Sequence, residues 1–200
     1  MATFDAVLGT QRVALPLARL DARLGIALLI TVDLGVAFCE RAGAELAAGL
    51  EGLGVDIVAS VATMGIPIAI EVTRHLGLDQ YVVFHKTPKI HLADAVSEPV
   101  QSITTSQPQR LLLDRARVPE LAGRRVAVVD DVVSTGASAA AALRLVRSVG
   151  ATPVAIATIA TEGDDWRRLL GADAALVRSL GALPLFDVLA DGTFEPRAGH

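Results

Sequence analysis

The chain has 200 residues, of which 52% are hydrophobic and only 4% aromatic, and its formal net charge is −4. This length is typical of a single domain with an ample aliphatic core, and the acidic balance argues against a nucleic-acid partner, which normally binds a basic face. The lone cysteine, Cys39, excludes an internal disulfide and is typical of a reducing cytoplasm. The apolar run near Gly25–Val32 is too short to span a bilayer and no signal peptide is apparent, so we expect a soluble cytoplasmic protein.

The N-terminal region carries no recognisable reaction motif. Residues 1–24 lack a clean periodicity, and Pro16 interrupts any helix there. Residues 24–32 predict a strand, and residues 35–53 predict a long amphipathic helix.

A strand, a glycine turn and a helix follow in the sequence. Val55–Ser60 is a short β-rich run, and a helix is predicted to begin near Pro67. Residues 62–65 form the turn between them. Because the first N–H groups of a helix lack partners and carry partial positive charge, this turn is a potential anion-binding site. The alternative is an ordinary strand–helix turn without a ligand.

A basic turn follows the next predicted strand, Gln80–Phe84. Lys86 and Lys89 lie in the sequence His-Lys-Thr-Pro-Lys, and two compact ammonium groups at a strand end suit pyrophosphate. The alternative is a solvated basic turn. Residues 90–110 form a long, polar segment interrupted by prolines, which predicts a hairpin or flap with a return strand at Leu111–Asp114.

The strongest pattern is VAVVDDVVSTGAS, at residues 126–138. Val126–Val129 predict a strand buried on both faces, and Asp130 and Asp131 follow where that strand ends. A small hydroxyl and glycine loop then leads into a helix that ends at Gly150.

The order of these parts predicts a site for a sugar phosphate. Gly136 allows the backbone to approach a ligand closely, and nearby Ser and Thr hydroxyls add donors at the helix N-terminus. Two carboxylates just before the loop suit the vicinal hydroxyls of a sugar, or a magnesium ion bound to them. The alternative is a strand end with a Ser/Thr cap, which is common in α/β proteins.

The C-terminal part predicts further strands. Thr152–Thr161 reads as a buried strand, and residues 175–180 and 183–188 as short ones, before a loose tail at 190–200. Since strands alternate with helices, we expect a parallel α/β sheet with ligand groups at the carboxyl ends of its strands.

Three acids follow the strand that ends at Thr161. Glu162, Asp164 and Asp165 are interpreted first as caps of the helix that begins near Trp166.

The pattern at 126–138 resembles the signature of the type I phosphoribosyltransferases, in which hydrophobic residues precede two acids and a Thr-Gly loop. That family binds 5-phosphoribosyl-1-pyrophosphate. The resemblance implies an α/β fold with a mostly parallel twisted sheet flanked by helices and a small hood built from the chain ends. It implies one domain over residues 1–200, with a core at about 34–161 and a hood from about 1–33 and 162–190.

The resemblance also implies roles along the ligand. Asp130 and Asp131 would bind the ribose hydroxyls, with Mg²⁺ held there through those hydroxyls or water. Lys86 and Lys89 would stabilise the leaving pyrophosphate, with His85 beside them. The residues implied for the 5-phosphate are Val133, Ser134, Thr135, Gly136, Ala137 and Ser138. The residues implied for the pyrophosphate loop, in which the family often has a strained or cis peptide, are Ala62, Thr63, Met64 and Gly65.

The identity of the base depends on the flap and on Glu162. Ser102 and Thr104 form a Ser-x-Thr pattern similar to that of the xanthine phosphoribosyltransferases, and the flap lacks the glutamate of the adenine-specific members. The turn from His85 to Lys89 is similar to the adenine branch instead. A carboxylate at Glu162 would favour a base with an amino group. The resemblance therefore implies purine salvage, in which adenine and phosphoribosyl pyrophosphate give AMP and pyrophosphate.

Two alternatives stay open. The base is xanthine or guanine in the first. In the second, the protein is a regulator that binds phosphoribosyl pyrophosphate without reaction, since Thr63 or Met64 stands where adenine-using members carry an arginine. If the protein is an enzyme, the resemblance implies a pentosyl-transferring glycosyltransferase that uses Mg²⁺, binds no nucleic acid or membrane, and forms a homodimer.

Overall fold

The computed structural model describes residues 2–92, 94–100 and 109–197. Its centre is a five-stranded sheet in which every neighbouring pair is parallel. The strands, in spatial order, are β10 (Val177–Leu183), β9 (Thr152–Glu162), β8 (Arg125–Val133), β4 (Ile57–Val61) and β5 (Tyr81–Phe84). The predicted parallel α/β sheet is confirmed.

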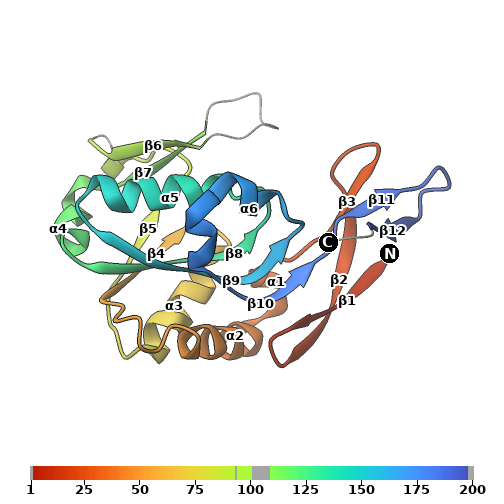
Figure 1. The fold of residues 1–200 in the computed structure, drawn as a ribbon, viewed down its shortest axis with the longest axis horizontal. Helices are drawn as coiled ribbons and strands as arrows, with labels where there is room; N and C mark the ends of the chain where they lie inside the picture. The colour runs from red at the N-terminus through yellow and green to blue at the C-terminus, as the bar shows by residue number, and fades with distance from the viewer. Residues whose placement is uncertain (1, 93, 101–108, 198–200) are drawn as a thin grey trace.

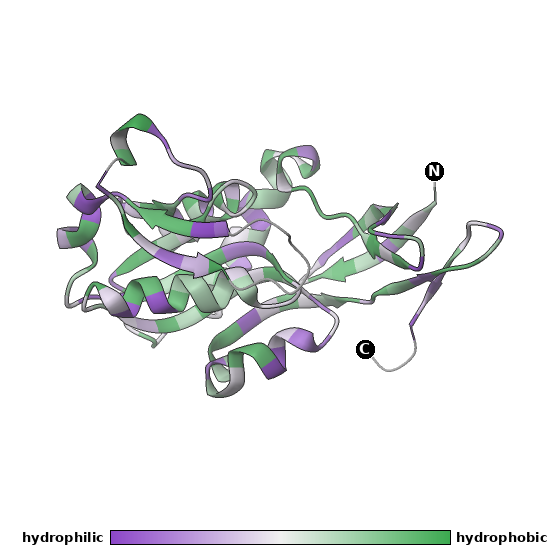
Figure 2. Cartoon of the chain, turned by 90° about the horizontal axis from the view of Figure 1, so that it is seen from above, coloured by the Kyte–Doolittle hydropathy of each residue, from purple (hydrophilic) through white to green (hydrophobic). Residues whose placement is uncertain are grey.

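Helices cover both faces of this sheet (Figure 1). Helices α2 (Val36–Ala48) and α3 (Gly65–His75) lie on one face, and α5 (Ala137–Ser148) lies on the other. All five residues of β4 are buried, because a strand in the middle of such a sheet has no solvent-facing side. Figure 2 shows that the central strands are largely hydrophobic, whereas hydrophilic residues gather in the outer helices and turns.

The chain ends together form a second sheet, which is antiparallel. Its spatial order is β1 (Thr3–Leu8), β2 (Gln11–Arg19), β3 (Leu24–Ala27), β11 (Phe186–Val188) and β12 (Phe194–Pro196). Phe186 packs edge-to-face against Phe4 and Phe194, which joins the N-terminal and C-terminal strands. The first and last strands of the chain, β1 and β12, thus both lie at this end of the molecule (Figure 1).

A two-stranded hairpin, β6 (Val96–Val100) and β7 (Gln109–Leu113), lies over α5 as the predicted flap. The remaining helices are short: α1 (Thr31–Leu34), α4 (Val118–Leu121), α6 (Asp165–Leu170) and the 3₁₀ turns at Ile90–Leu92, Arg115–Arg117 and Gly171–Leu176. Within the ranges that the structure describes, no helix has the length and apolar character that a bilayer crossing requires.

The N-terminal predictions need three corrections. Residues 1–24 contain the β1–β2 hairpin, in which Pro16 has no N–H to donate but still accepts a hydrogen bond at its carbonyl from the Leu28 N–H at 2.8 Å. The strand predicted over 24–32 ends at Ala27. The apolar sequence continues beyond it because Leu29, which follows the strand, is buried in the core. The helix predicted over 35–53 ends at Ala48, since the buried Leu50 lies in the following turn.

Two further corrections concern the C-terminal part. The segment predicted at 175–180 as part of the hood is β10, which pairs with β9 and extends the parallel sheet. The tail predicted over 190–200 contains β12, where Phe194 packs on the antiparallel sheet.

Candidate functional site

Two loops meet at the carboxyl ends of neighbouring strands. Ser60 of β4 pairs in register with Val129 of β8, so the turn after β4 lies beside the acid pair that follows Val129. A side-chain carbon at Gly65 would come within 2.7 Å of Ser60 Oγ and 2.8 Å of Asp130 Oδ1. The missing side chain therefore allows the start of α3 to approach the acids closely. The Ser60 hydroxyl is buried there and has no hydrogen-bond partner within the described ranges.

The acid pair occupies β8 just before its end. The Asp131 N–H donates to Asp130 Oδ1 at 3.0 Å, and the Thr158 hydroxyl of β9 donates to the Asp131 carbonyl at 2.8 Å. Burial raises the pKa of Asp130 well above its ordinary value, and the neighbouring Asp131 carboxylate raises it further. The charge of Lys86 lowers the pKa of Asp130, so the basic turn lies close enough to act on the acid pair.

The hydroxyl loop after β8 encloses a small cavity. Gly136 adopts a left-handed conformation, with φ 82°, and α5 begins directly after it. The Thr135 Oγ1 accepts a hydrogen bond from the Ala137 N–H at 3.4 Å. The cavity measures about 120 Å³, which is the scale of a phosphate group, and its lining consists of Asp130 and residues 132–139. All six residues implied for the 5-phosphate, Val133 to Ser138, line it.

Glu162 faces this loop and does not cap the next helix. Its Oε2 accepts a hydrogen bond from the Ser134 hydroxyl at 2.7 Å, and its side chain is only 7% exposed. Burial raises the pKa of Glu162, while the bond from Ser134 lowers it. The interpretation as a helix cap is wrong for Glu162. Asp164 is the N-cap residue of α6 and Asp165 lies in its first turn, where an acid is favourable, and the two aspartates also pair with Arg167 and Arg168.

The second loop carries no charged side chain. The Ala62–Thr63 peptide bond is cis, and α3 begins at Gly65. The hydroxyl of the fully buried Thr31 donates to the Met64 carbonyl at 2.7 Å. This bond ties the loop to α1 and hence to the segment that leaves the antiparallel sheet.

The basic turn follows β5 at the edge of the parallel sheet. His85 exchanges two backbone hydrogen bonds with Leu112 of β7, at 2.9 and 2.8 Å, which places the hairpin beside the turn. Lys86 and Lys89 are exposed, and they are the only lysines in the chain. Every other basic side chain that is charged at neutral pH is an arginine.

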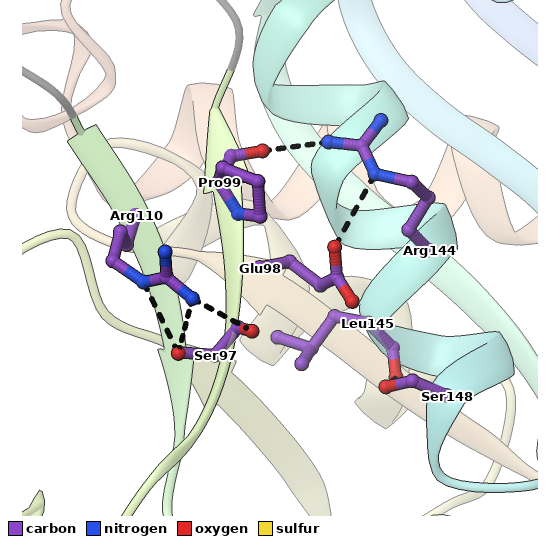
Figure 3. A network of polar contacts seen from close by, with 7 residues as sticks. All are labelled: Ser97, Glu98, Pro99, Arg110, Arg144, Leu145 and Ser148. Atoms are coloured by element: carbon purple, nitrogen blue, oxygen red, sulfur yellow. Dashed lines mark hydrogen bonds and ion pairs between the residues drawn. The ribbon is translucent and has the colours of Figure 1, made fainter.

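The hairpin is fixed to the helix that begins at the hydroxyl loop (Figure 3). Arg144 of α5 donates to the Glu98 carboxylate at 3.3 Å and to the Pro99 carbonyl at 2.6 Å. Arg110 binds Ser97 across the two strands. The predicted flap residues Ser102 and Thr104 lie outside the described residues.

The structure thus brings the acid pair, the hydroxyl loop, residues 62–65 and Lys86 to one edge of the sheet. The sequence analysis missed three supporting hydroxyls, which belong to Thr31, Ser60 and Thr158. Isolated hydroxyl residues in apolar runs carry no motif, so only their burial in the fold reveals them.

Comparison with known proteins identifies the family. Residues 39–175 match the family model described as "Phosphoribosyl transferase domain". The chain belongs to this family. It has the type I phosphoribosyltransferase fold, lies in the purine branch and is a phosphoribosyltransferase enzyme.

Individual relatives carry two different names. A xanthine phosphoribosyltransferase of Laribacter hongkongensis is 27% identical over 78% of this chain and 77% of its own length. An adenine phosphoribosyltransferase of Mycobacterium avium is 31% identical over 74% of this chain and 70% of its own length. The structure of the adenine phosphoribosyltransferase of Thermoanaerobacter pseudethanolicus superposes with a TM-score of 0.64 at 25% identity, covering 76% of this chain and 84% of that one.

Proposed function

We propose that this enzyme transfers the phosphoribosyl group of phosphoribosyl pyrophosphate to adenine, giving AMP and pyrophosphate. The observation that carries the proposal is the close approach of Gly65 to Asp130, which places two helix N-termini on either side of one acid pair. A ligand with an anionic group at each end and a sugar between them matches this order.

The hydroxyl loop would hold the 5-phosphate. Its cavity offers backbone N–H groups at the start of α5 together with the hydroxyls of Thr135 and Ser138. Asp130 and Asp131 would accept hydrogen bonds from the ribose hydroxyls. The transfer develops positive charge on the ribose, which carboxylates beside it stabilise.

The pyrophosphate would lie between residues 62–65 and the basic turn. The loop contributes backbone groups only, so Lys86 and Lys89 would supply the positive side-chain charge. These two residues are the only lysines in the chain, and their ammonium groups would present compact point charges to the pyrophosphate.

The residues present fit a magnesium ion that arrives with the substrate. Mg²⁺ keeps several waters and binds through one or two carboxylates plus substrate phosphates, which matches a pair of aspartates. No group of three or more His, Cys, Asp or Glu side chains able to hold a metal occurs in the ranges described. When bound through water or the ribose hydroxyls at Asp130 and Asp131, Mg²⁺ would neutralise charge on the pyrophosphate.

Adenine is favoured among the purines by the Mycobacterium avium relative, which is named an adenine phosphoribosyltransferase, and by the His85–Lys89 turn. Glu162 no longer supports this choice, because its carboxylate is bonded to Ser134. Xanthine is the second candidate, since the relative from Laribacter hongkongensis is named for it.

The test is pyrophosphate release with phosphoribosyl pyrophosphate and Mg²⁺, offered adenine, guanine, hypoxanthine, xanthine or uracil in turn. We expect turnover with adenine, and none in the Asp130→Asn/Asp131→Asn double variant. Turnover with xanthine alone would overturn the choice of base. Saturable binding of phosphoribosyl pyrophosphate without turnover of any base would overturn the transfer reaction and leave a ligand-binding regulator.

A further inference from the structure

The hydroxyl loop is supported from behind by the turn that follows β9. Glu162 ends that strand, and its carboxylate accepts a hydrogen bond from the Ser134 hydroxyl, with the two oxygens 2.7 Å apart. Gly136 of the loop also lies close to the start of α6, because a side-chain carbon at Gly136 would come within 3.1 Å of Trp166 Cα. Trp166 is buried, and its indole N–H donates to the Gly163 carbonyl at 3.0 Å.

The same turn touches the C-terminal strands. The Gly163 N–H donates to the Leu183 carbonyl at 3.2 Å, and a side-chain carbon at Gly163 would meet Leu185 Cδ1 at 3.1 Å. The turn is therefore held on both sides, by the loop and by the chain between β10 and β11.

The Ser134–Glu162 bond decides what the serine can offer a ligand. A serine hydroxyl has one proton, and an ionised carboxylate only accepts hydrogen bonds. A serine hydroxyl that donates its hydrogen bond to Glu162 cannot donate to a phosphate oxygen at the same time. Within the described residues Glu162 forms no ion pair, and its carboxylate is bonded to Ser134.

We propose that Glu162 is a positioning residue for the phosphate loop, which it fixes by accepting a hydrogen bond from the Ser134 hydroxyl, and that Ser134 does not donate to the ligand phosphate. This inference rests on the proposed function of the loop. It assigns phosphate binding within residues 134–138 to the backbone N–H groups and to the Thr135 and Ser138 hydroxyls.

The proposal is tested by binding of ribose 5-phosphate, which occupies the loop without any turnover. Glu162→Ala and Ser134→Ala should each weaken ribose 5-phosphate binding about tenfold, since each removes a hydrogen bond to a charged group. The double variant should be no weaker than either single variant, because both changes break one interaction. Glu162→Gln, which keeps an accepting oxygen, should stay within about threefold of the wild type.

Inorganic pyrophosphate serves as the internal control, and its binding should be unchanged in all four variants. Glu51→Ala, at an exposed position, is the matched control for loss of a glutamate. Unfolding midpoints measured alongside identify a variant that has lost its fold, and in that case Glu162→Leu, which fills the buried space without an accepting oxygen, takes the place of Glu162→Ala. A Ser134→Ala variant that loses phosphate binding while Glu162→Ala keeps it would overturn the proposal. Failure of the wild type to bind ribose 5-phosphate would instead overturn the proposed function.

Discussion

The two strand–loop–helix units of this sheet perform the same geometric task with different chemistry. Both loops follow a buried strand and open a helix, α3 in one case and α5 in the other. Residues 134–138 bring their own hydroxyls and enclose a cavity. Residues 62–65 contain no charged side chain. Thr31 donates a hydrogen bond to the carbonyl of this loop, and Asp130 lies so close to Gly65 that a side chain there would clash.

This difference explains why the sequence indicates the first unit strongly and the second only weakly. A self-sufficient anion site carries its donors in consecutive positions, so it reads as a motif. Residues 62–65 contain no charged side chain, and in the proposed site the positive charge comes from Lys86 and Lys89 further along the chain, so the turn alone resembles an ordinary strand–helix turn. We expect the first unit to be sensitive to changes within itself and the second to changes in its neighbours.

The acid pair between the units should give the largest effect. Asp130→Asn and Asp131→Asn should each lower kcat/KM by about 10³-fold, because charge stabilisation beside the ribose is lost. Steady-state pyrophosphate release measures this. A loss below tenfold in both variants would contradict the role of the pair.

The same Asp130→Asn variant should be more stable than the wild type in the absence of ligand. The pKa of Asp130 in the folded protein lies above its ordinary value of 3.8, so the folded state binds more protons than the unfolded state. The wild type therefore loses stability as pH rises from that ordinary value through the raised one, and the asparagine variant does not. Urea unfolding at pH 4 and pH 8 checks the sign: the advantage of the variant should appear only at the higher pH.

Gly65→Ala should give the next largest effect, because the added methyl group meets Ser60 and Asp130 below 3 Å. We expect kcat/KM to fall by about 10²-fold through displacement of the two loops, and the free energy of unfolding to fall by about 1–3 kcal/mol. Gly49→Ala is the matched control, since Gly49 has φ −67° and its nearest neighbour would be 3.3 Å away. Equal effects in the two variants would refute the close approach.

Lys86→Gln and Lys89→Gln should each raise the KM for phosphoribosyl pyrophosphate about tenfold with little change in the KM for the base. The two lysines are the only side-chain amines in the chain, so chemical acetylation gives an independent measure. Pyrophosphate should protect both from acetylation, with the α-amino group as the unprotected reference. Absence of protection would show that pyrophosphate does not bind at this turn.

Thr31→Val should raise the same KM about fivefold, because a hydrogen bond of about 1 kcal/mol to Met64 is lost. Thr31→Ser keeps the hydroxyl and should behave like the wild type. Both variants should bind ribose 5-phosphate normally, since the hydroxyl loop does not touch Thr31. Equal losses for both ligands would show a general structural effect instead.

Arg144→Ala should give the smallest effect. Its contacts with Glu98 and Pro99 join the hairpin to α5, but the arginine side chain is 40% exposed and its ion pair is worth at most about 1 kcal/mol. We expect kcat to change by about two- to threefold, measured at low salt. If Glu98→Gln shows no change in the same direction, the hairpin is not held through this pair.

Some parts of the fold could be predicted from the sequence and others could not. The central strands and the helices α2, α3 and α5 were predictable because apolar runs and helical periodicity dominate there. The β1–β2 hairpin was not, because Pro16 and a half-buried pattern obscure the alternation. The strand β10 was assigned to the hood, since nothing local in residues 177–183 distinguishes an edge of one sheet from an edge of the other.

The candidate site likewise has parts that could be predicted from the sequence and parts that could not. The acid pair and the hydroxyl loop are contiguous in sequence, so their position could be predicted. The contact between Glu162 and Ser134 spans 28 positions, and that between Thr31 and Met64 spans 33. Such pairings depend on strand order and loop geometry, which no local pattern encodes.

The most direct test is a crossed binding experiment by calorimetry, with ribose 5-phosphate and pyrophosphate as separate probes. It compares the Thr135→Ala/Ser138→Ala variant with the Lys86→Gln/Lys89→Gln variant. We predict that the first loses about tenfold in affinity for ribose 5-phosphate alone, and that the second loses about tenfold for pyrophosphate alone. A variant that loses both ligands equally, or an exchange of the two patterns, would contradict the division of the site into two anion-binding units.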